Sequence, residues 1–168
     1  MQVDDRALND VVRRLSAAGR IEEVQHIVRS APRRLVQAGG GTLVLRDGDA
    51  CFYADEDAAS PLWKGQRFPI DQCISGWAMV HERTTVVPDI MVDERIPHDA
   101  YKPTFIRSLV MVPIGRPPFA AMGAYWDMVY EPSSAELTVL ERVATAAAAA
   151  IDRIGLDSAP VTPDLRRT

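Results

Sequence analysis

The 168-residue chain has no long apolar run, few lysines and only two cysteines. Its longest uninterrupted apolar run, residues 146–151, is too short to span a bilayer, because a transmembrane helix needs about 20 apolar residues. The N-terminal sequence MQVDDRALND lacks the basic and then apolar segments of a signal peptide. These absences predict a cytoplasmic protein that makes no membrane contact.

Basic residues are also in the minority, with 19 Lys and Arg against 23 Asp and Glu and a formal net charge of -4. A protein that binds nucleic acid non-specifically normally presents a basic face to the phosphates. We therefore expect no nucleic-acid partner. Cys51 and Cys73 are expected to be free thiols in a protein of cytosolic character, and no spacing of Cys and His fits a structural zinc site.

The composition, 47% hydrophobic and 25% charged, is typical of a single folded soluble domain. Apolar residues recur at helical spacing in residues 4–18 and again up to Leu35, where Pro32 predicts a kink or a late start of the second helix. A last helix over residues 133–154 begins with the capping-box pattern Ser-Ser-Ala-Glu.

The segment between these helices has the pattern of an antiparallel sheet. Asp47 and Gly48, between β-forming residues, predict a hairpin of strands 42–46 and 50–54. Helices at both ends with strands between them predict an α+β sandwich. Further strands are expected at 67–70, 84–87, 107–114 and 119–129, with a short helix at 75–81.

Two connections differ from the rest of the chain. Residues 55–66 are acidic and are expected to form a loop that carries Trp63 as an exposed or lid-like aromatic. Residues 89–105 have two prolines, several charges and little periodicity. Because a connection of that length in a compact domain is usually functional or disordered, we expect it to be the moving part of the protein.

Six ordered segments identify a family resemblance: SPLWKGQRFPI, CISGWAMVHE, VVPDI, DERIPHDAY, TFIRSLVMVPI and GAYW. Together they resemble the GAF domain, a small-molecule sensory fold related to PAS domains, of the type found beside bacterial sensor histidine kinases. The resemblance implies a GAF/PAS-like sandwich, with a central six-stranded antiparallel sheet, helices on one face and ligand-pocket loops on the other. It implies an N-terminal dimer and signalling helix over residues 1–20, a GAF domain over 21–155 and a disordered tail over 156–168.

The resemblance does not identify a ligand or cofactor, because GAF domains bind very different molecules. GAF domains that bind cyclic nucleotides share an Asn-Lys-Phe-Asp-Glu signature, whereas Asn9 is the only asparagine here and lies in the first helix. GAF domains that bind bilins attach the chromophore through a cysteine in the loop before the pocket helix. Cys51 lies in the predicted hairpin and Cys73 precedes Ile74, so we expect neither of these ligand classes.

Free methionine sulfoxide reductases are GAF enzymes that need a nucleophilic thiol and resolving thiols near the pocket. In their Val-Cys-Gly element the cysteine directly precedes glycine, but here Ser75 precedes Gly76. Their second cysteine lies in the long loop, where residues 96–99 of this chain contain none. We therefore expect no enzyme activity, and we favour Cys73 as a small buried residue at a strand-to-helix junction over its alternative as a redox sensor.

Aromatic residues gather around the long loop and are predicted to line an apolar cavity with polar edges, the usual composition of a ligand site. These residues are Trp77, Tyr101, Phe105 and Trp126, and core packing alone explains each of them about as well. Asp89 is expected to hold the loop by accepting hydrogen bonds from its amides.

Arg107 begins a strand beside this loop, and two roles are open for it. Its guanidinium is suited to bind a ligand carboxylate or phosphate through two hydrogen bonds. Alternatively it forms a salt bridge to Asp89 or Asp93, which we consider the stronger of the two. The candidate ligand-binding residues are Trp77, Asp89, Tyr101, Phe105, Arg107 and Trp126, and no catalytic or metal-binding residue is predicted.

Apolar and small residues in the last helix follow alternating spacings of three and four, as in a short heptad seam. Two interpretations stay open: the helix packs on its own sheet, or it forms a dimer contact with a second copy, and one helix can do both. The seam comprises Leu137, Leu140, Ala144, Ala147, Ile151 and Ile154.

We expect a non-enzymatic sensory domain that binds a small molecule and signals through a dimeric helix bundle. Its partners would be a second copy of itself and a sensor histidine kinase or another signalling protein of a two-component system. Two alternatives remain: a dimerisation or scaffold module with a filled pocket, and a thiol-based redox sensor or enzyme related to the free methionine sulfoxide reductases.

Overall fold

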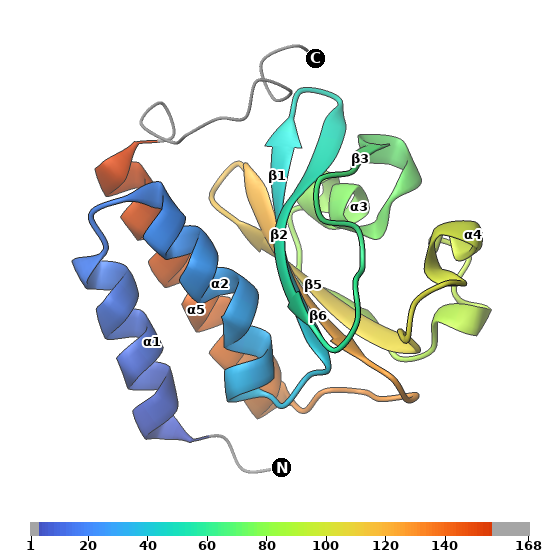
Figure 1. Cartoon of the computed structure of the whole chain (residues 1–168), viewed down its shortest axis with the longest axis horizontal. Helices are drawn as coiled ribbons and strands as arrows, with labels where there is room; N and C mark the ends of the chain where they lie inside the picture. The colour runs from blue at the N-terminus through green and yellow to red at the C-terminus, as the bar shows by residue number, and fades with distance from the viewer. Residues whose placement is uncertain (1–3, 156–168) are drawn as a thin grey trace.

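A six-stranded antiparallel sheet in the order β3-β2-β1-β6-β5-β4 lies at the centre of the computed structural model, which describes residues 4–155. Three long helices cover one face of the sheet, and α3, α4 and the irregular segments lie on the other (Figure 1). This architecture confirms the predicted α+β sandwich. The tail predicted over residues 156–168 lies outside the described residues.

The helices and strands follow the predicted order closely. Within residues 4–155 no helix is both long and apolar enough to cross a bilayer. The helices are α1 (Asp5–Ala17), α2 (Ile21–Leu35), α3 (Ile74–His81), α4 (His98–Tyr101) and α5 (Ser134–Ile154), with 3-10 turns η1 (Ile70–Gln72) and η2 (Ile90–Val92). The strands are β1 (Gly40–Asp47), β2 (Ala50–Ala58), β3 (Arg67–Pro69), β4 (Thr85–Val87), β5 (Ser108–Ile114) and β6 (Ala120–Trp126).

The ends of the long helices follow the local sequence signals. The Ser133 side chain accepts a hydrogen bond from the Glu136 amide, and the Glu136 carboxylate accepts one from the Ser133 amide, which confirms the capping box of α5. Asp4 caps α1 by accepting from the amide of Arg6 at 2.9 Å. Helix α2 begins at Ile21 and continues through Pro32, so the predicted alternative of a late helix start is wrong.

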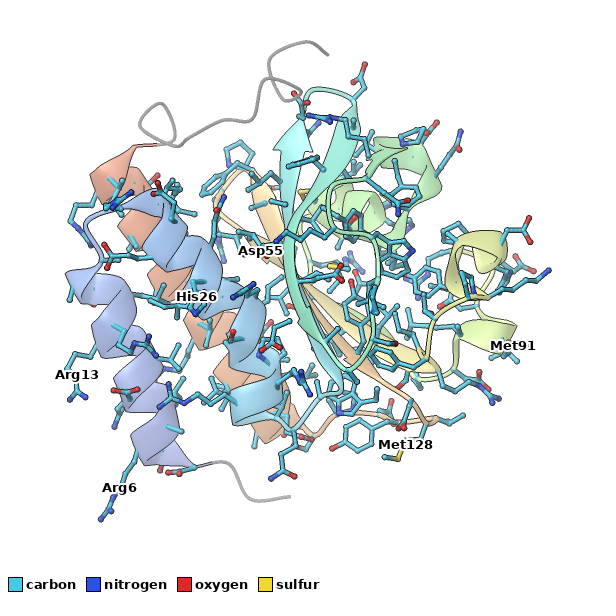
Figure 2. The ribbon with its side chains drawn as sticks, viewed as in Figure 1. Arg6, Arg13, His26, Asp55, Met91 and Met128 are labelled. Atoms are coloured by element: carbon cyan, nitrogen blue, oxygen red, sulfur yellow. The ribbon has the colours of Figure 1, made fainter. Side chains whose placement is uncertain are left out.

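The predicted hairpin is confirmed, but its strands are longer than the sequence indicated. Strand β2 continues to Ala58, which pairs with Gly40, so the prediction of a loop over residues 55–58 is wrong. The acidic residues there fit a strand because α2 supplies arginines opposite them. Arg29 contacts Asp55 at 3.1 Å and Arg33 contacts Asp57 at 3.0 Å, and Figure 2 labels Asp55 where the sheet faces α2.

The glycine run at the start of β1 lets other elements approach its backbone closely. A side chain at Gly41 would meet the backbone oxygen of Arg29, so α2 crosses the sheet at this point. Side chains at Gly39 and Gly40 would both come within 3.1 Å of the Phe105 ring, which packs over this stretch from the opposite face. The glycines therefore allow helix and loop to pack on the two faces of one strand.

Alternation along the strands divides the interior into two cores. On β6, Met122 and Trp126 lie in the helix-side core, whereas Ala121 and Tyr125 lie in the loop-side core. Successive residues of a strand point to opposite faces, so one strand serves both cores. Each face of the sheet is therefore covered, and the loop-side core is built largely by short or irregular segments.

The heptad-like seam of α5 is mainly an internal packing surface. Leu140, Ala144, Ala147 and Ile151 are buried in the helix-side core with α1 and α2, and Leu137 and Ile154 are partly buried against it. The interpretation of a helix packed on its own domain thus holds for these residues. Because the seam is occupied within one chain, a dimer contact needs other residues, and dimerisation stays a prediction.

Substitution of Ala147 by Glu tests this assignment. Ala147 is fully buried, so a carboxylate there has no partner and we expect a loss of at least about 3 kcal/mol in the free energy of unfolding, measured in urea. Ala149→Glu, on the exposed side of the same helix, is the matched control and should change it by about 0.5 kcal/mol or less. A stable Ala147→Glu protein that had lost only self-association would contradict the assignment.

Candidate functional site

Four buried aromatic side chains meet on the loop side of the sheet. Tyr53 comes from β2, Tyr125 from β6, Tyr101 from α4 and Trp63 from the segment that joins β2 to β3. The Trp63 ring centroid lies 5.3 Å from that of Tyr53, 4.7 Å from that of Tyr101 and 5.8 Å from that of Tyr125. All three contacts are edge-to-face, a favourable geometry for aromatic pairs. We call these four residues the aromatic cluster.

Trp63 is the centre of this cluster and is held by two sets of hydrogen bonds. Its indole nitrogen donates to the backbone oxygen of Ala100 at 3.1 Å. The amides of Leu62, Trp63 and Lys64 donate to the Glu56 carboxylate at 2.8, 2.9 and 2.8 Å, so one side chain of β2 anchors the whole turn. Trp63 is only 5% exposed, so the prediction of an exposed aromatic is wrong, whereas its role as a lid stays a prediction.

A surface cavity of about 320 Å³ lies beside Trp63, between the turn that carries this residue and the region of α4. This volume is near the lower end of the range typical of small-molecule sites. Trp63 lines this cavity and also contacts the three buried tyrosines, so its ring connects the cavity to the aromatic cluster. The cavity is lined by Pro61, Leu62, Trp63, Gln66, Phe68, Ala100, Pro103 and Thr104.

A larger groove of about 960 Å³ lies on the helix side, between α5 and the turn from β5 to β6. It is lined mainly by charged and small residues such as Arg83, Arg116 and Glu141, and no member of the aromatic cluster borders it. Convergent aromatic residues beside a concave surface are the better sign of a ligand site. We therefore take the cavity beside Trp63 as the candidate site.

Two tyrosines of the cluster, Tyr53 and Tyr125, have polar partners at their hydroxyl groups. The Tyr125 hydroxyl lies 2.9 Å from the Thr42 hydroxyl, in a position that requires a glycine at residue 123 because a side chain there would collide with both groups. The Tyr53 hydroxyl lies 3.1 Å from that of Ser75. Burial raises the pKa of Tyr53, Tyr101 and Tyr125, so these phenols stay neutral and present only hydrogen-bonding groups.

Three of the predicted ligand residues border the loop-side core, and one of them belongs to the aromatic cluster. Tyr101 is a member of the cluster, and Phe105 and Trp77 are partly buried against the core that contains it. Trp77 is partly exposed on α3, where its ring stacks on His81 at 3.8 Å and the Arg95 guanidinium lies 4.7 Å from it. Trp126 lies in the helix-side core, because it follows Tyr125 on β6 and therefore points to the opposite face.

Asp89 and Arg107 pair with each other outside the aromatic cluster. The Arg107 side chain donates two hydrogen bonds to the Asp89 carboxylate, at 2.9 and 3.2 Å. This pairing lowers the pKa of Asp89 and raises that of Arg107. The salt bridge considered for Arg107 is therefore present, and Asp89 also accepts from the Met91 amide at 2.9 Å, as expected for a residue that holds the loop.

The long connection after β4 contains more structure than the sequence indicated. It includes η2 and α4, and a ring nitrogen of His98 lies 2.8 Å from the backbone oxygen of Ile90, which ties these two turns together. The Asp93 carboxylate accepts two side-chain hydrogen bonds from Arg95, at 3.0 and 2.6 Å. These contacts do not test whether the connection moves, which stays a prediction. Any movement would have to break these hydrogen bonds.

The sequence analysis missed Tyr53 and Tyr125 as site residues and left the position of Trp63 open. Period-two alternation offers a signal for Tyr125, since Tyr125 and Trp126 cannot both face the same core. Tyr53 lies in the predicted hairpin, and its face follows from the register with β1. No local pattern places Trp63, because its position depends on the distant partners Glu56 and Ala100.

A family model described as the GAF domain matches residues 18–152. The chain belongs to the GAF domain family. The six-stranded antiparallel sheet with helices on one face is thus a GAF architecture, as the resemblance implied. No curated protein matches the chain.

Solved structures agree with this assignment at the level of the fold. A GAF domain from an Acinetobacter phosphoenolpyruvate-protein phosphotransferase superposes with a TM-score of 0.77 at 14% identity, covering 88% of this chain and 92% of the other. The free methionine-R-sulfoxide reductase of Neisseria meningitidis, in complex with its substrate, gives 0.76 at 14% identity over 92% and 95% of the two chains. The chromophore-binding domain of a bacteriophytochrome from R. palustris gives 0.74 at 15% identity over 89% and 61%.

The buried tyrosines predict a characteristic alkaline titration. The pKa of Tyr130 is also raised, to about 12, because its hydroxyl donates to the Glu136 carboxylate. We therefore expect no phenolate absorbance from the folded protein at pH 10, whereas in denaturant all four tyrosines should ionise near their ordinary pKa of about 10. The neutral phenol is favoured by folding, so this contribution to stability is complete below pH 10 and is lost as the pH rises above it.

Tyr130→Phe separates the loop-side tyrosines from the residue outside the cluster. The folded Tyr130→Phe protein should still show no phenolate absorbance at pH 10. Circular dichroism at the same pH should confirm that the fold persists. One phenol or more that ionises near pH 10 in the folded variant would contradict the burial of the cluster.

Proposed function

We propose that this GAF domain is a sensor whose ligand takes the place of the Trp63 ring within the aromatic cluster. The observation that carries the proposal is the position of Trp63: a side chain from an irregular segment fills the centre of the loop-side core, directly beside a surface cavity. A strand or helix would hold such a residue more firmly. Here the indole ring itself makes one hydrogen bond, to Ala100.

The chemistry of the cluster favours a flat, largely apolar ligand without negative charge. Tyr53, Tyr101 and Tyr125 offer ring edges and hydroxyl groups. The carboxylate of Glu56 already accepts hydrogen bonds from the amides of the turn. The cluster itself contains no cation, and Arg107 is already paired with Asp89. A neutral or weakly cationic planar molecule of about the size of an indole ring is the ligand class that fits.

Binding would shift the protein between two states. With Trp63 inside, the pocket is closed; with a ligand inside, the turn of residues 62–64 must move outward or rearrange. The ligand favours the second state only by its greater affinity for it, and its apparent affinity falls in proportion to the rarity of the open state. The movement is proposed to pass to the terminal helices and to a partner such as a sensor histidine kinase.

The proposal includes a homodimer that uses outward-facing residues of the helical layer. Helices α1 and α5 contact each other in the helical layer, on the face of the sheet opposite α3 and α4 (Figure 1). A signal that reaches this layer can then alter the contact between two copies. The proposed function is non-enzymatic, and the alternative of a scaffold with a permanently filled cluster differs from it in one measurable respect.

Replacement of Trp63 by Ala removes the internal competitor. We expect the Trp63→Ala protein to bind indole and related neutral planar heterocycles at least ~10-fold more tightly than the wild type, measured by isothermal calorimetry. Trp126→Ala is the matched control, because it removes an equal side chain from the helix-side core. Native mass spectrometry of freshly purified wild-type protein would show any bound cellular molecule.

The two models give opposite results in this experiment. A permanently filled scaffold predicts that both alanine variants only lose stability, by about 3–5 kcal/mol for removal of a large aromatic side chain, with no preference of Trp63→Ala for ring compounds. Equal affinity of Trp63→Ala and Trp126→Ala for indole would therefore exclude the sensor proposed here.

The non-enzymatic part of the proposal has its own test. In the free methionine sulfoxide reductases a cysteine directly precedes the glycine, whereas in this chain Ser75 precedes Gly76. We therefore expect no turnover of free methionine sulfoxide in the presence of a dithiol reductant. Cys73→Ser should leave the fold and the ligand affinity unchanged. Turnover by the wild type that disappears in Cys73→Ser would make the protein an enzyme.

A further inference from the structure

The only two cysteines of the chain meet at one corner of the loop-side core. Cys51 lies on β2, where it pairs with Phe68 of the edge strand β3, and Cys73 follows the 3-10 turn that leaves this strand. The Cys73 thiol donates to the backbone oxygen of Pro69 at 3.5 Å, which places it under the end of β3. Both cysteines are buried members of the same core.

A hydrogen-bonded group of side chains surrounds the two sulfurs. The Ser75 hydroxyl lies 3.4 Å from the Cys73 sulfur as a donor, and the Tyr53 hydroxyl lies 3.1 Å from that of Ser75. Cys51 lies beside Ala50, which pairs with the same Pro69 whose backbone oxygen the Cys73 thiol contacts, so both sulfurs lie at this end of β3. In agreement with this position, each thiol shifts the pKa of the other as a neighbouring hydrogen-bonding group. The thiol pair is therefore joined to the aromatic cluster through Ser75 and Tyr53.

The surroundings make the two thiols unequal. The pKa of Cys73 is lowered, first by the Cys51 thiol as a donor and then by Ser75 and the amide of Gly76. The pKa of Cys51 is raised, because a second thiolate beside the first is unfavourable and its site is buried. Cys73 keeps 6% exposure and Cys51 has none, so the more acidic thiol is also the more accessible one.

We propose that Cys51 and Cys73 form a reversible intramolecular disulfide when the protein meets a peroxide. The Cys73 thiolate attacks one oxygen of hydrogen peroxide, the O–O bond breaks, and the leaving hydroxide takes up a proton to become water. The Cys51 thiol then loses its proton, and its sulfur attacks the Cys73 sulfenic acid, whose hydroxyl leaves as a second water. Two thiols and one peroxide give one disulfide and two waters.

The two roles follow from the geometry. Attack on peroxide needs a thiolate that peroxide can reach, and Cys73 meets this need better than Cys51 because it keeps 6% exposure and the lower pKa. Resolution needs a sulfur already beside the sulfenic acid, and there proximity compensates for the high pKa of Cys51. The disulfide would tie β2 to the start of α3, next to the Ser75–Tyr53 hydrogen bond. This inference does not depend on the ligand proposed above.

The test treats the full folded chain with a small excess of hydrogen peroxide and then counts thiols after denaturation. We expect the count to fall from two to none, the mass of the monomer to drop by two hydrogen atoms, and a dithiol reductant to restore both thiols. Non-reducing peptide mapping should find the peptides of Cys51 and Cys73 linked. Because the pKa of Cys73 is lowered to about 7, the rate should rise with pH up to that value and level off above it, below the ordinary cysteine pKa of about 8.5.

Single substitutions assign the two roles. Cys51→Ser should still react at Cys73 and accumulate a sulfenic acid that dimedone traps, whereas in Cys73→Ser the remaining thiol should react at least ~10-fold more slowly. Cys51→Ala serves as a second variant at the buried position, and circular dichroism verifies each fold. A disulfide between two copies, independent oxidation of both cysteines, or equal rates in the two serine variants would overturn the proposal.

Discussion

The central sheet buries both of its faces, and this constraint organises the rest of the molecule. Neighbouring residues of one strand must satisfy two different cores, so Tyr125 faces the loops while Trp126 faces the helices. The helix side is packed by three long helices with regular apolar faces. The loop side is closed by short elements, so it depends on a few large side chains placed by specific hydrogen bonds.

Trp63 shows how such a closure is built. Its ring supplies apolar area to the loop-side core, while the Glu56 carboxylate and the Ala100 backbone oxygen hold its segment in place. An irregular segment held by a small number of bonds opens at a lower free-energy cost than a strand within a sheet. The same arrangement stabilises the closed domain, and in the proposed function it would let the domain respond to a molecule that competes for the site.

The thiol corner and the aromatic cluster share one wall of the domain. Ser75, at the start of α3, has the Tyr53 hydroxyl on one side and the Cys73 sulfur on the other. The next residue must be a glycine, because a side chain at position 76 would collide with the Ile70 backbone. The start of α3 therefore packs directly on the preceding 3-10 turn η1. A chemical change at the thiols and a ligand at the rings would thus act on neighbouring parts of the same structure.

Local signals in the sequence determined most of the fold. The capping box at Ser133, the hairpin turn near Gly48 and the periodicity of the long helices need only residues close in the chain, and the ordered segments indicated the GAF family. The same signals predicted an end of strand β2 that is too early, because residues 55–58 are acidic and indicated a loop. In the folded protein α2 places Arg29 and Arg33 opposite Asp55 and Asp57, and these distant partners are not visible in the local sequence.

The tertiary structure alone decided the site. Trp63 meets tyrosines from β2, α4 and β6, and Cys51 meets Cys73 across a strand and a turn; neither meeting leaves a periodic trace in the sequence. It also decided which face each aromatic residue serves, and that the seam of α5 is filled by its own domain. Short-range hydrogen bonds and periodicity are encoded within a few residues, whereas a pocket consists of contacts between segments that only the completed sheet brings together.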